Sequence, residues 1–172
     1  MGIGNPGELY ILTYLERQYV KVEPIGGEHK RRDYRCFIDS GNSEDVEGKT
    51  DTQIAVTHNL PWEPFRIEND GQRAYISWGY NTSVQRCIFY SPQLLSIYDI
   101  RNEDIRRVIW NHIYEKPPQR VIHCVPTITD NDRITFIFTV PIDLLNKAGV
   151  LTTVDISEYD LSKSIPMQGK FK

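Results

Sequence analysis

The sequence contains few cysteines and no long apolar segment. Its three cysteines are odd in number and lie far apart in the 172-residue chain, which disfavours a disulfide framework and fits a reducing compartment. No apolar run approaches the roughly 20 residues that a membrane-spanning helix requires, and the first residues lack the basic start and apolar stretch of a signal peptide. We therefore expect a soluble, cytoplasmic protein that has no membrane partner.

Strong enzyme motifs are also missing. The chain has no Gly-x-Ser-x-Gly sequence and no phosphate-binding P-loop, which are signatures of α/β-hydrolases and of P-loop nucleotide hydrolases. Structural zinc sites use cysteine and histidine ligands at short, paired spacings. The one adjacent pair here, His123 and Cys124, would point to opposite faces of a strand. The sequence therefore predicts no zinc site.

Neither sign of charge dominates the chain. Lysine and arginine number 20 against 23 aspartates and glutamates, which gives a net charge of −3. This balance argues against a surface coated with basic charge, although a basic cleft can lie on an acidic body. The charges are unevenly placed, because residues 29–32 and Arg35 form a basic cluster, and an acidic segment follows at residues 43–47.

The composition is that of a folded globular protein. Hydrophobic residues make up 40% of the chain and charged residues 25%, near the average for globular domains. A chain of this length fits one domain and can bury enough surface to fold without disulfides or metals. We expect a single globular domain over residues 1–161, followed by a loosely ordered polar tail over residues 162–172.

Short β-strands account for most of the predicted structure. Runs rich in β-branched and aromatic residues are separated by Gly, Pro, Asn and Asp, and Asn69-Asp70-Gly71 is a good hairpin turn. Residues 9–15 also read as a β-rich run, with a helix as the competing interpretation, and residues 40–48 read as a polar loop. The predicted strands are residues 18–22, 34–38, 50–57, 65–67, 74–78, 86–90, 120–125, 133–140 and 150–156.

One helix has a clear signature, over residues 102–115. Its apolar residues recur at helical spacing, and prolines follow its end. Pro92 and Pro141 each predict the start of a short helix, because proline is favoured at the first helical position. The predicted fold class is α+β and β-rich, with a mixed or antiparallel sheet or pseudobarrel, one clear amphipathic helix and two short Pro-initiated helices. The residues expected on the buried face of the main helix are Ile105, Val108, Ile109 and Ile113.

A lysine and an aspartate enter a predicted strand directly from the acidic segment, in the sequence Lys49-Thr50-Asp51. Metal-dependent nucleases need a carboxylate on one strand and a carboxylate-x-lysine sequence on its neighbour. Two oxygens then hold Mg²⁺ at the scissile phosphate, while the lysine positions or activates water. The region resembles the active-site hairpin of type II restriction endonucleases, in which an Ile-Ser-x-Lys segment follows on the next strand. Ile76 and Ser77 match that segment, but its lysine position falls on Gly79.

A second set of residues also matches the same pattern. Asp39 or Asp45 could supply the first carboxylate, with Glu47-Gly48-Lys49 as the carboxylate-x-lysine sequence, although glycine sits poorly inside a catalytic strand. For a nuclease, the resemblance implies a Mg²⁺ cofactor. For a protein that only binds, no cofactor is expected. The catalytic candidates that the resemblance implies are Asp39, Asp45, Glu47, Lys49 and Asp51.

Nucleic-acid recognition does not need a catalytic lysine. Basic side chains contact phosphates or guanine edges, and amide and guanidinium groups read base edges. Residues 78–86 combine aromatic, amide and guanidinium groups, with Arg86 favoured for a base contact. A basic loop that only maintains solubility is the alternative interpretation. The candidate DNA-binding residues are Lys30, Arg31, Arg32, Arg35, Trp78, Tyr80, Asn81, Gln85 and Arg86.

Three functions remain open at this point. The first is a recognition domain for double-stranded DNA that is related to restriction endonucleases and has no catalysis of its own, because Gly79 stands where a lysine is wanted. The second is a Mg²⁺-dependent restriction-type endonuclease. The third is a phage or viral assembly protein that binds protein partners through its 10 tyrosines, 6 phenylalanines and 3 tryptophans. Each is compatible with a chain that belongs to a larger parent protein.

Overall fold

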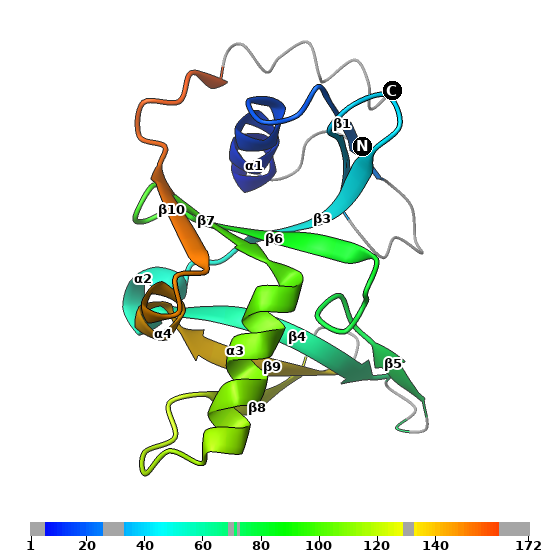
Figure 1. The fold of residues 1–172 in the computed structure, drawn as a ribbon. Coiled ribbons are helices and arrows are strands. Elements are labelled where there is room, and N and C mark those ends of the chain that lie inside the picture. Colours follow the sequence, from blue (N-terminus) through cyan, green and yellow to red (C-terminus); the bar gives the residue numbers. More distant parts are fainter. Residues whose placement is uncertain (1–5, 26–32, 69–70, 72, 129–132, 162–172) are drawn as a thin grey trace.

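The fold is α+β and β-rich, as the sequence predicts (Figure 1). The computed structural model describes residues 6–25, 33–68, 71, 73–128 and 133–161. Within these ranges the chain forms four helices and two open sheets, one of six strands and one of four. The predicted tail over residues 162–172 and the basic residues Lys30, Arg31 and Arg32 lie outside the described residues.

The six-stranded sheet is mixed. Its order is β1-β2-β3-β6-β7-β10, and β3 runs parallel to β6 while the other neighbours are antiparallel. The β3–β6 pair is the junction between an N-terminal meander and the later strands. The strands are β1 (Lys21–Pro24), β2 (Tyr34–Phe37), β3 (Ser43–Thr50), β6 (Val84–Ser91), β7 (Ser96–Arg101) and β10 (Leu151–Asp155).

The four-stranded sheet is antiparallel, in the order β5-β4-β9-β8. It confirms both predicted hairpins, β4–β5 and β8–β9. A β-bulge lies in β4 between Trp62 and Phe65. Its strands are β4 (Asn59–Ile67), β5 (Ala74–Ile76), β8 (His123–Ile128) and β9 (Ile134–Pro141).

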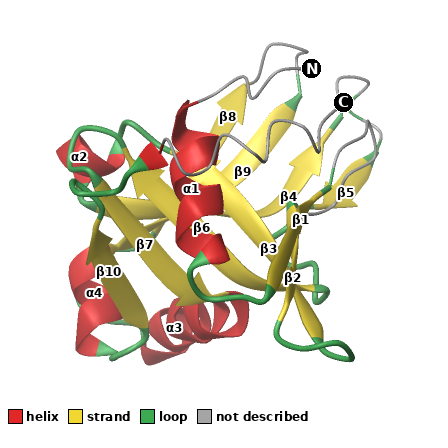
Figure 2. Ribbon diagram, turned by 90° about the horizontal axis from the view of Figure 1, so that it is seen from above, coloured by secondary structure: helices red, strands yellow, loops and turns green. Residues whose placement is uncertain are grey.

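The elements pack in layers around the six-stranded sheet. Helix α1 covers one face of this sheet, and the four-stranded sheet lies on the other side, with α3 alongside (Figures 1 and 2). Two apolar clusters fill the spaces between the layers, one under α1 and one between the sheets. No helix in the described ranges is long and apolar enough to cross a membrane. The helices are α1 (Pro6–Glu16), α2 (Ile54–Thr57), α3 (Asn102–Glu115) and α4 (Ile142–Lys147).

Three of the N-terminal predictions are wrong. The β-rich run at residues 9–15 belongs to α1, the competing interpretation, because it buries Ile11, Leu12 and Leu15 against the six-stranded sheet. The predicted loop at residues 40–48 contains most of β3, and the predicted strand at residues 50–57 contains the end of β3 and the short α2. The acidic residues of β3 are compatible with a central strand because arginine and lysine side chains neutralise them, as described below.

The helix predicted after Pro92 is also absent. Residues 92–95 form a turn between β6 and β7, and the antiparallel register pairs Ser91 with Ser96. Leu95 adopts a positive φ of 46° in this turn, a conformation that does not continue a right-handed helix. The helix predicted after Pro141 is present as α4. The main helix is present as α3 over the predicted residues.

Candidate active site

A cleft of about 1020 Å³ opens between the two sheets, and we call it the inter-sheet cleft. One wall comes from β3, from the residue before β2 and from the first turn of α1. The other wall comes from β4, β5, the turn that follows β5 and the residue before β9. Its ionisable lining residues are Glu8, Asp33, Glu47, Lys49, Glu63, Arg66 and Arg133.

Alternation along β3 places Glu47 and Lys49 in this cleft. In the parallel register they lie beside Cys87 and Phe89 of β6, which belong to the core between the sheets. Val46 faces the opposite way and packs under α1. The Nζ atom of Lys49 lies 2.9 Å from Oε1 of Glu47. The side chain of Glu47 is 8% exposed and that of Lys49 is 35% exposed, so the pair is shielded by protein but reachable from the cleft.

Asp33 is tied to the same stretch of β3. It directly precedes β2, and its backbone N–H donates to the carbonyl of Val46 at 3.1 Å. The backbone N–H of Gly48 in turn donates to Oδ2 of Asp33 at 3.0 Å. The Asp33 carboxylate is therefore held beside the backbone that joins Glu47 to Lys49.

Gly48 has a packing reason to be glycine. A Cβ atom at this position would lie 2.9 Å from Cε2 of Tyr34 and 3.3 Å from two carbons of Ile11. Ile11 belongs to α1, and both neighbours are buried in the apolar cluster between this helix and the six-stranded sheet. The sequence suggested that glycine sits poorly within a catalytic strand, but here it lets α1 and Tyr34 close over the back of β3 while its N–H orients Asp33.

The charges in the cleft act on each other. Burial raises the pKa of Glu47 from its ordinary 4.5 to about 7, and the nearby Asp33 and Glu63 carboxylates add to this rise while Lys49 opposes it. Burial alone would lower the pKa of Lys49, but Glu47, Glu63 and Asp33 outweigh it and raise that pKa. Lys49 is therefore a cation at neutral pH, and Glu47 titrates close to neutrality.

The facing wall carries a third carboxylate. Oε2 of Glu63 accepts a hydrogen bond from Oγ of Ser77 at 3.3 Å, and the carbonyl of Glu63 accepts one from the N–H of Gly79 at 2.8 Å. A Cβ atom on Gly79 would lie 2.5 Å from that carbonyl oxygen. Gly79 is thus set by close backbone packing, and the position expected to carry a lysine has no room for a side chain.

The two segments that carried the nuclease resemblance do not pair with each other. Strand β5, which contains Ile76, pairs with β4, whereas β3, which contains Lys49, pairs with β2 and β6. They lie on opposite walls of the inter-sheet cleft. The carboxylate-x-lysine pattern therefore comes from β3 alone, as Glu47-Gly48-Lys49. These three residues pair with β6, and β2 pairs with the residues of β3 that precede them.

No family model, no curated protein and no solved structure matches this chain. The chemistry of the cleft is therefore inferred from its own residues alone. In the described part of the chain, no three Asp, Glu, His or Cys side chains converge as a ready-made metal site. Asp33 and Glu47 both line the cleft, and the Asp33 charge acts on Glu47. Mg²⁺ is commonly held by one or two protein carboxylates together with waters and substrate phosphates.

The other predicted catalytic residues lie elsewhere. Asp39 occupies an exposed turn, where its Oδ1 accepts hydrogen bonds from the N–H groups of residues 41 and 42, each at 2.8 Å. Asp45 pairs with Arg35, with 3.2 Å between Oδ1 and Nε. Asp51 accepts a 2.6 Å hydrogen bond from the N–H of Gln53. None of these three aspartates lines the inter-sheet cleft.

The residues predicted to bind DNA separate into three groups. Lys30, Arg31 and Arg32 lie outside the described residues. Arg35 is engaged with Asp45, and Oε1 of Gln85 accepts the N–H of Asp45 at 2.6 Å. The segment after β5 does reach the cleft, and its lining residues there include Trp78, Tyr80 and Asn81.

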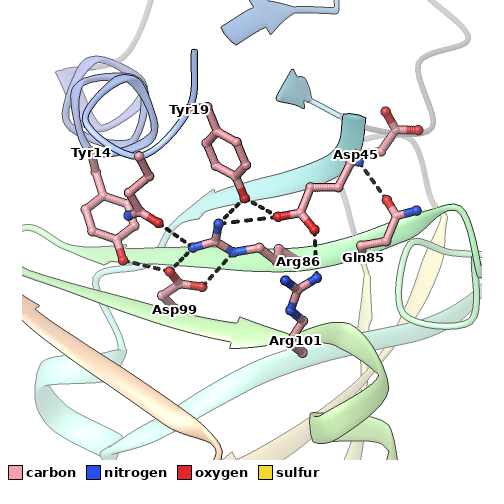
Figure 3. A network of polar contacts seen from close by, with 9 residues as sticks. Tyr14, Tyr19, Asp45, Gln85, Arg86, Asp99 and Arg101 are labelled. Atoms are coloured by element: carbon pink, nitrogen blue, oxygen red, sulfur yellow. Dashed lines mark hydrogen bonds and ion pairs between the residues drawn. The ribbon is translucent and has the colours of Figure 1, made fainter. Parts of the chain in front are cut away.

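Arg86, the expected base contact, lies in a buried network behind β3 (Figure 3). Its side chain is 11% exposed. Its Nε donates to Oδ1 of Asp99 at 3.1 Å, and its Nη atoms reach Asp99, Tyr19 and Glu44. Arg101 donates to the other oxygen of Glu44 at 2.6 Å. Arg86 therefore neutralises the acidic strand residues Asp99 and Glu44.

Sequence reasoning missed Asp33, Glu63 and Glu8. Asp33 adjoins the basic cluster and carries no local signal of its own. The signal that identifies it is its position directly before β2, which pairs with the part of β3 that precedes Glu47. This signal was hidden because β3 was predicted to be a loop. Glu63 and Glu8 reach the cleft from β4 and α1, so only tertiary structure brings them there.

Proposed function

We propose that this chain is a Mg²⁺-dependent nuclease whose catalytic residues are Asp33, Glu47 and Lys49. One observation carries the proposal. The carboxylate of Asp33 accepts the N–H of Gly48, the residue between Glu47 and Lys49, so all three functional groups meet in one cleft. Metal-dependent nucleases need a carboxylate on one strand and carboxylate-x-lysine on its neighbour, and here Asp33 directly precedes β2 while Glu47-Gly48-Lys49 lies on the neighbouring β3.

The donor set fits Mg²⁺. Both protein ligands would be carboxylates, and hard oxygen donors are what this ion prefers. Asp33 and Glu47 would hold the ion, which when bound would neutralise charge at the scissile phosphate and lower the pKa of a bound water. The raised pKa of Glu47 in the metal-free protein reflects burial beside Asp33 and Glu63, and a cation at this position would relieve that repulsion.

Lys49 acts as a positive charge in this proposal. Its pKa is raised, with Glu47, Glu63 and Asp33 outweighing the effect of burial, so it stays protonated and does not serve as a general base. Its ammonium group would donate hydrogen bonds to a phosphate oxygen as negative charge builds up there, and preorganised donors of this kind supply a large part of catalysis. Glu63 supports this role by keeping the ammonium charged.

The non-catalytic alternative depended on Gly79. That residue lies against the backbone of Glu63 on the far wall, and Lys49 supplies the lysine from β3 itself. We therefore favour hydrolysis over binding alone, with DNA as the proposed substrate and Mg²⁺ as the proposed cofactor.

Cleavage assays on labelled DNA test the proposal. The purified chain should cut DNA with Mg²⁺ and should not cut it in EDTA. Asp33→Asn and Glu47→Gln should each slow cleavage by at least about a hundredfold, the scale expected for loss of a positioned catalytic group. Asn at residue 33 can still accept the N–H of Gly48, so the thermal unfolding temperature should change little.

The matched controls are Asp39→Asn and Asp51→Asn. Both remove a carboxylate from the same region of the chain, but neither residue lines the cleft, so both variants should keep the parent rate. A folded parent protein that cuts neither single-stranded nor double-stranded DNA with Mg²⁺ or Mn²⁺ would overturn the proposed function. So would an Asp33→Asn variant that cuts at the parent rate.

A further inference from the structure

The wall opposite Asp33 and Glu47 combines paired arginines with an exposed aromatic ring. Arg66 of β4 and Arg133, just before β9, both line the inter-sheet cleft. A single carboxylate joins them, because Oε1 of Glu68 lies 3.3 Å from Nε of Arg66 and Oε2 lies 3.2 Å from Nε of Arg133. Glu68 thus holds both guanidinium groups at this wall of the cleft.

Tyr75 completes this wall. It lies directly opposite Arg66 in the β4–β5 register, and the Arg66 guanidinium carbon is 5.9 Å from the centre of its ring. Tyr75 is 40% exposed, and all three residues of β5 are exposed. Strand β5 is the edge of its sheet and stands away from the body of the protein in Figure 1. The ring can therefore be approached by a ligand.

The size of the cleft limits what can enter it. Its volume is about 1020 Å³, at the upper end of the roughly 300–1,000 Å³ typical of small-molecule pockets. A space of this size encloses a short stretch of one nucleic-acid strand and is too small to enclose a duplex. Proteins bind single strands without sequence preference by stacking bases on aromatic rings and holding phosphates with basic side chains, and this wall of the cleft carries both kinds of side chain.

We propose that the cleft takes single-stranded DNA or a locally unpaired strand, with phosphates at Arg66 and Arg133 and a base stacked on Tyr75. This inference rests on the proposed nuclease function and adds its substrate class. The strand would run between the walls, so that its phosphodiester faces Asp33, Glu47 and Lys49 while the adjoining nucleotides are held from the other side.

Binding in EDTA tests the inference without requiring cleavage. Fluorescence anisotropy would be measured with a labelled single strand and with the matching duplex, at several salt concentrations. The parent should bind the single strand more tightly. Arg66→Gln and Arg133→Gln should each flatten the dependence of log K on log salt by about 0.7, the value for one phosphate contact on a single strand. Arg66→Lys keeps the positive charge and should therefore keep the slope. A purely structural role for Arg66 would not require the slope to stay the same.

Tyr75→Ala should raise the Kd for the single strand by about fivefold to a hundredfold, the range for one lost base stack, and should leave the salt slope unchanged. The matched controls are Arg107→Gln and Tyr114→Ala, on the exposed face of α3, where Arg107 pairs with Asp104 and Tyr114 is 77% exposed. Both controls should bind like the parent. Thermal unfolding of each variant confirms that the fold is kept.

Failure of this inference is separable from failure of the nuclease proposal. Equal or tighter binding of the duplex, or a Tyr75→Ala variant that binds the single strand like the parent, overturns the single-strand inference. If that protein still cuts duplex DNA in a manner that depends on Asp33 and Glu47, the nuclease function stands. Conversely, selective single-strand binding without any cleavage supports the binding wall and contradicts the nuclease.

Discussion

The backbone N–H of Gly48 donates a 3.0 Å hydrogen bond to the carboxylate of Asp33. Gly48→Ala should weaken the fold, because the new Cβ would lie 2.9 Å from the buried ring of Tyr34. We expect a loss of about 1–3 kcal/mol in the free energy of unfolding, the usual cost of overpacking a core. Chemical denaturation measures it. Gly41→Ala is the control, since its nearest neighbour is 3.7 Å away, and it should cost under about 0.5 kcal/mol.

The raised pKa of Glu47 predicts a pH dependence of stability in the metal-free protein. The pKa rises from 4.5 to about 7 on folding, so between these values the folded state holds the proton more tightly than the unfolded state. Stability contributed by this group is therefore lost as the pH rises through this window. Glu47→Gln removes the effect. As the pH rises from the lower to the upper of these values, the free energy of unfolding of the variant should increase relative to that of the parent by at most about 3 kcal/mol.

Urea unfolding in EDTA at a series of pH values measures this difference. Glu115→Gln, an exposed change at the end of α3, is the matched control and should track the parent at every pH. A difference between Glu47→Gln and the parent that stays constant from acid to neutral pH would show that Glu47 titrates normally.

Helix α3 offers a test of packing with an internal control. Ile109 is 2% exposed, whereas Ile113, which the spacing also places on the apolar face, is 45% exposed. Ile109→Ala should cost about 2–5 kcal/mol in the free energy of unfolding, as for other buried truncations. Ile113→Ala should cost under about 1 kcal/mol. Equal losses for the two variants would mean that the helix is rotated from the orientation described here.

Local sequence patterns predict the elements that form from residues close together in the chain. The α3 helix follows from the spacing of its apolar residues, and the β4–β5 and β8–β9 hairpins follow from alternation and turn residues. Burial of Ile113 was predicted wrongly. Helical spacing identifies the apolar face of the helix, but it does not show how far along the helix other elements cover that face. The buried residues of α3 end at Ile109, and Ile113, one turn later, is exposed.

Strand β3 could not be predicted from local pattern because its partners are distant. Its acidic run reads as a solvated loop, yet Glu44 is neutralised by Arg101, 57 residues away, and by Arg86, 42 residues away. Charge pairing of this kind has no periodicity in the sequence. The same error hid the candidate site, since Glu47 and Lys49 were identified but Asp33 becomes their neighbour only when β2 and β3 pair.

Single-turnover cleavage by Lys49→Met tests the central claim most directly. Methionine keeps the unbranched apolar stem of the side chain and removes the ammonium group, whose Nζ lies 2.9 Å from Oε1 of Glu47, together with its charge and its hydrogen-bond donors. The comparison is Lys147→Met, which removes an exposed lysine from α4. We predict that the parent and Lys147→Met cut DNA with Mg²⁺ at the same rate, and that Lys49→Met is slower by at least about a hundredfold. Equal rates for all three folded proteins, or no cleavage by the parent, would contradict a catalytic centre at Asp33, Glu47 and Lys49.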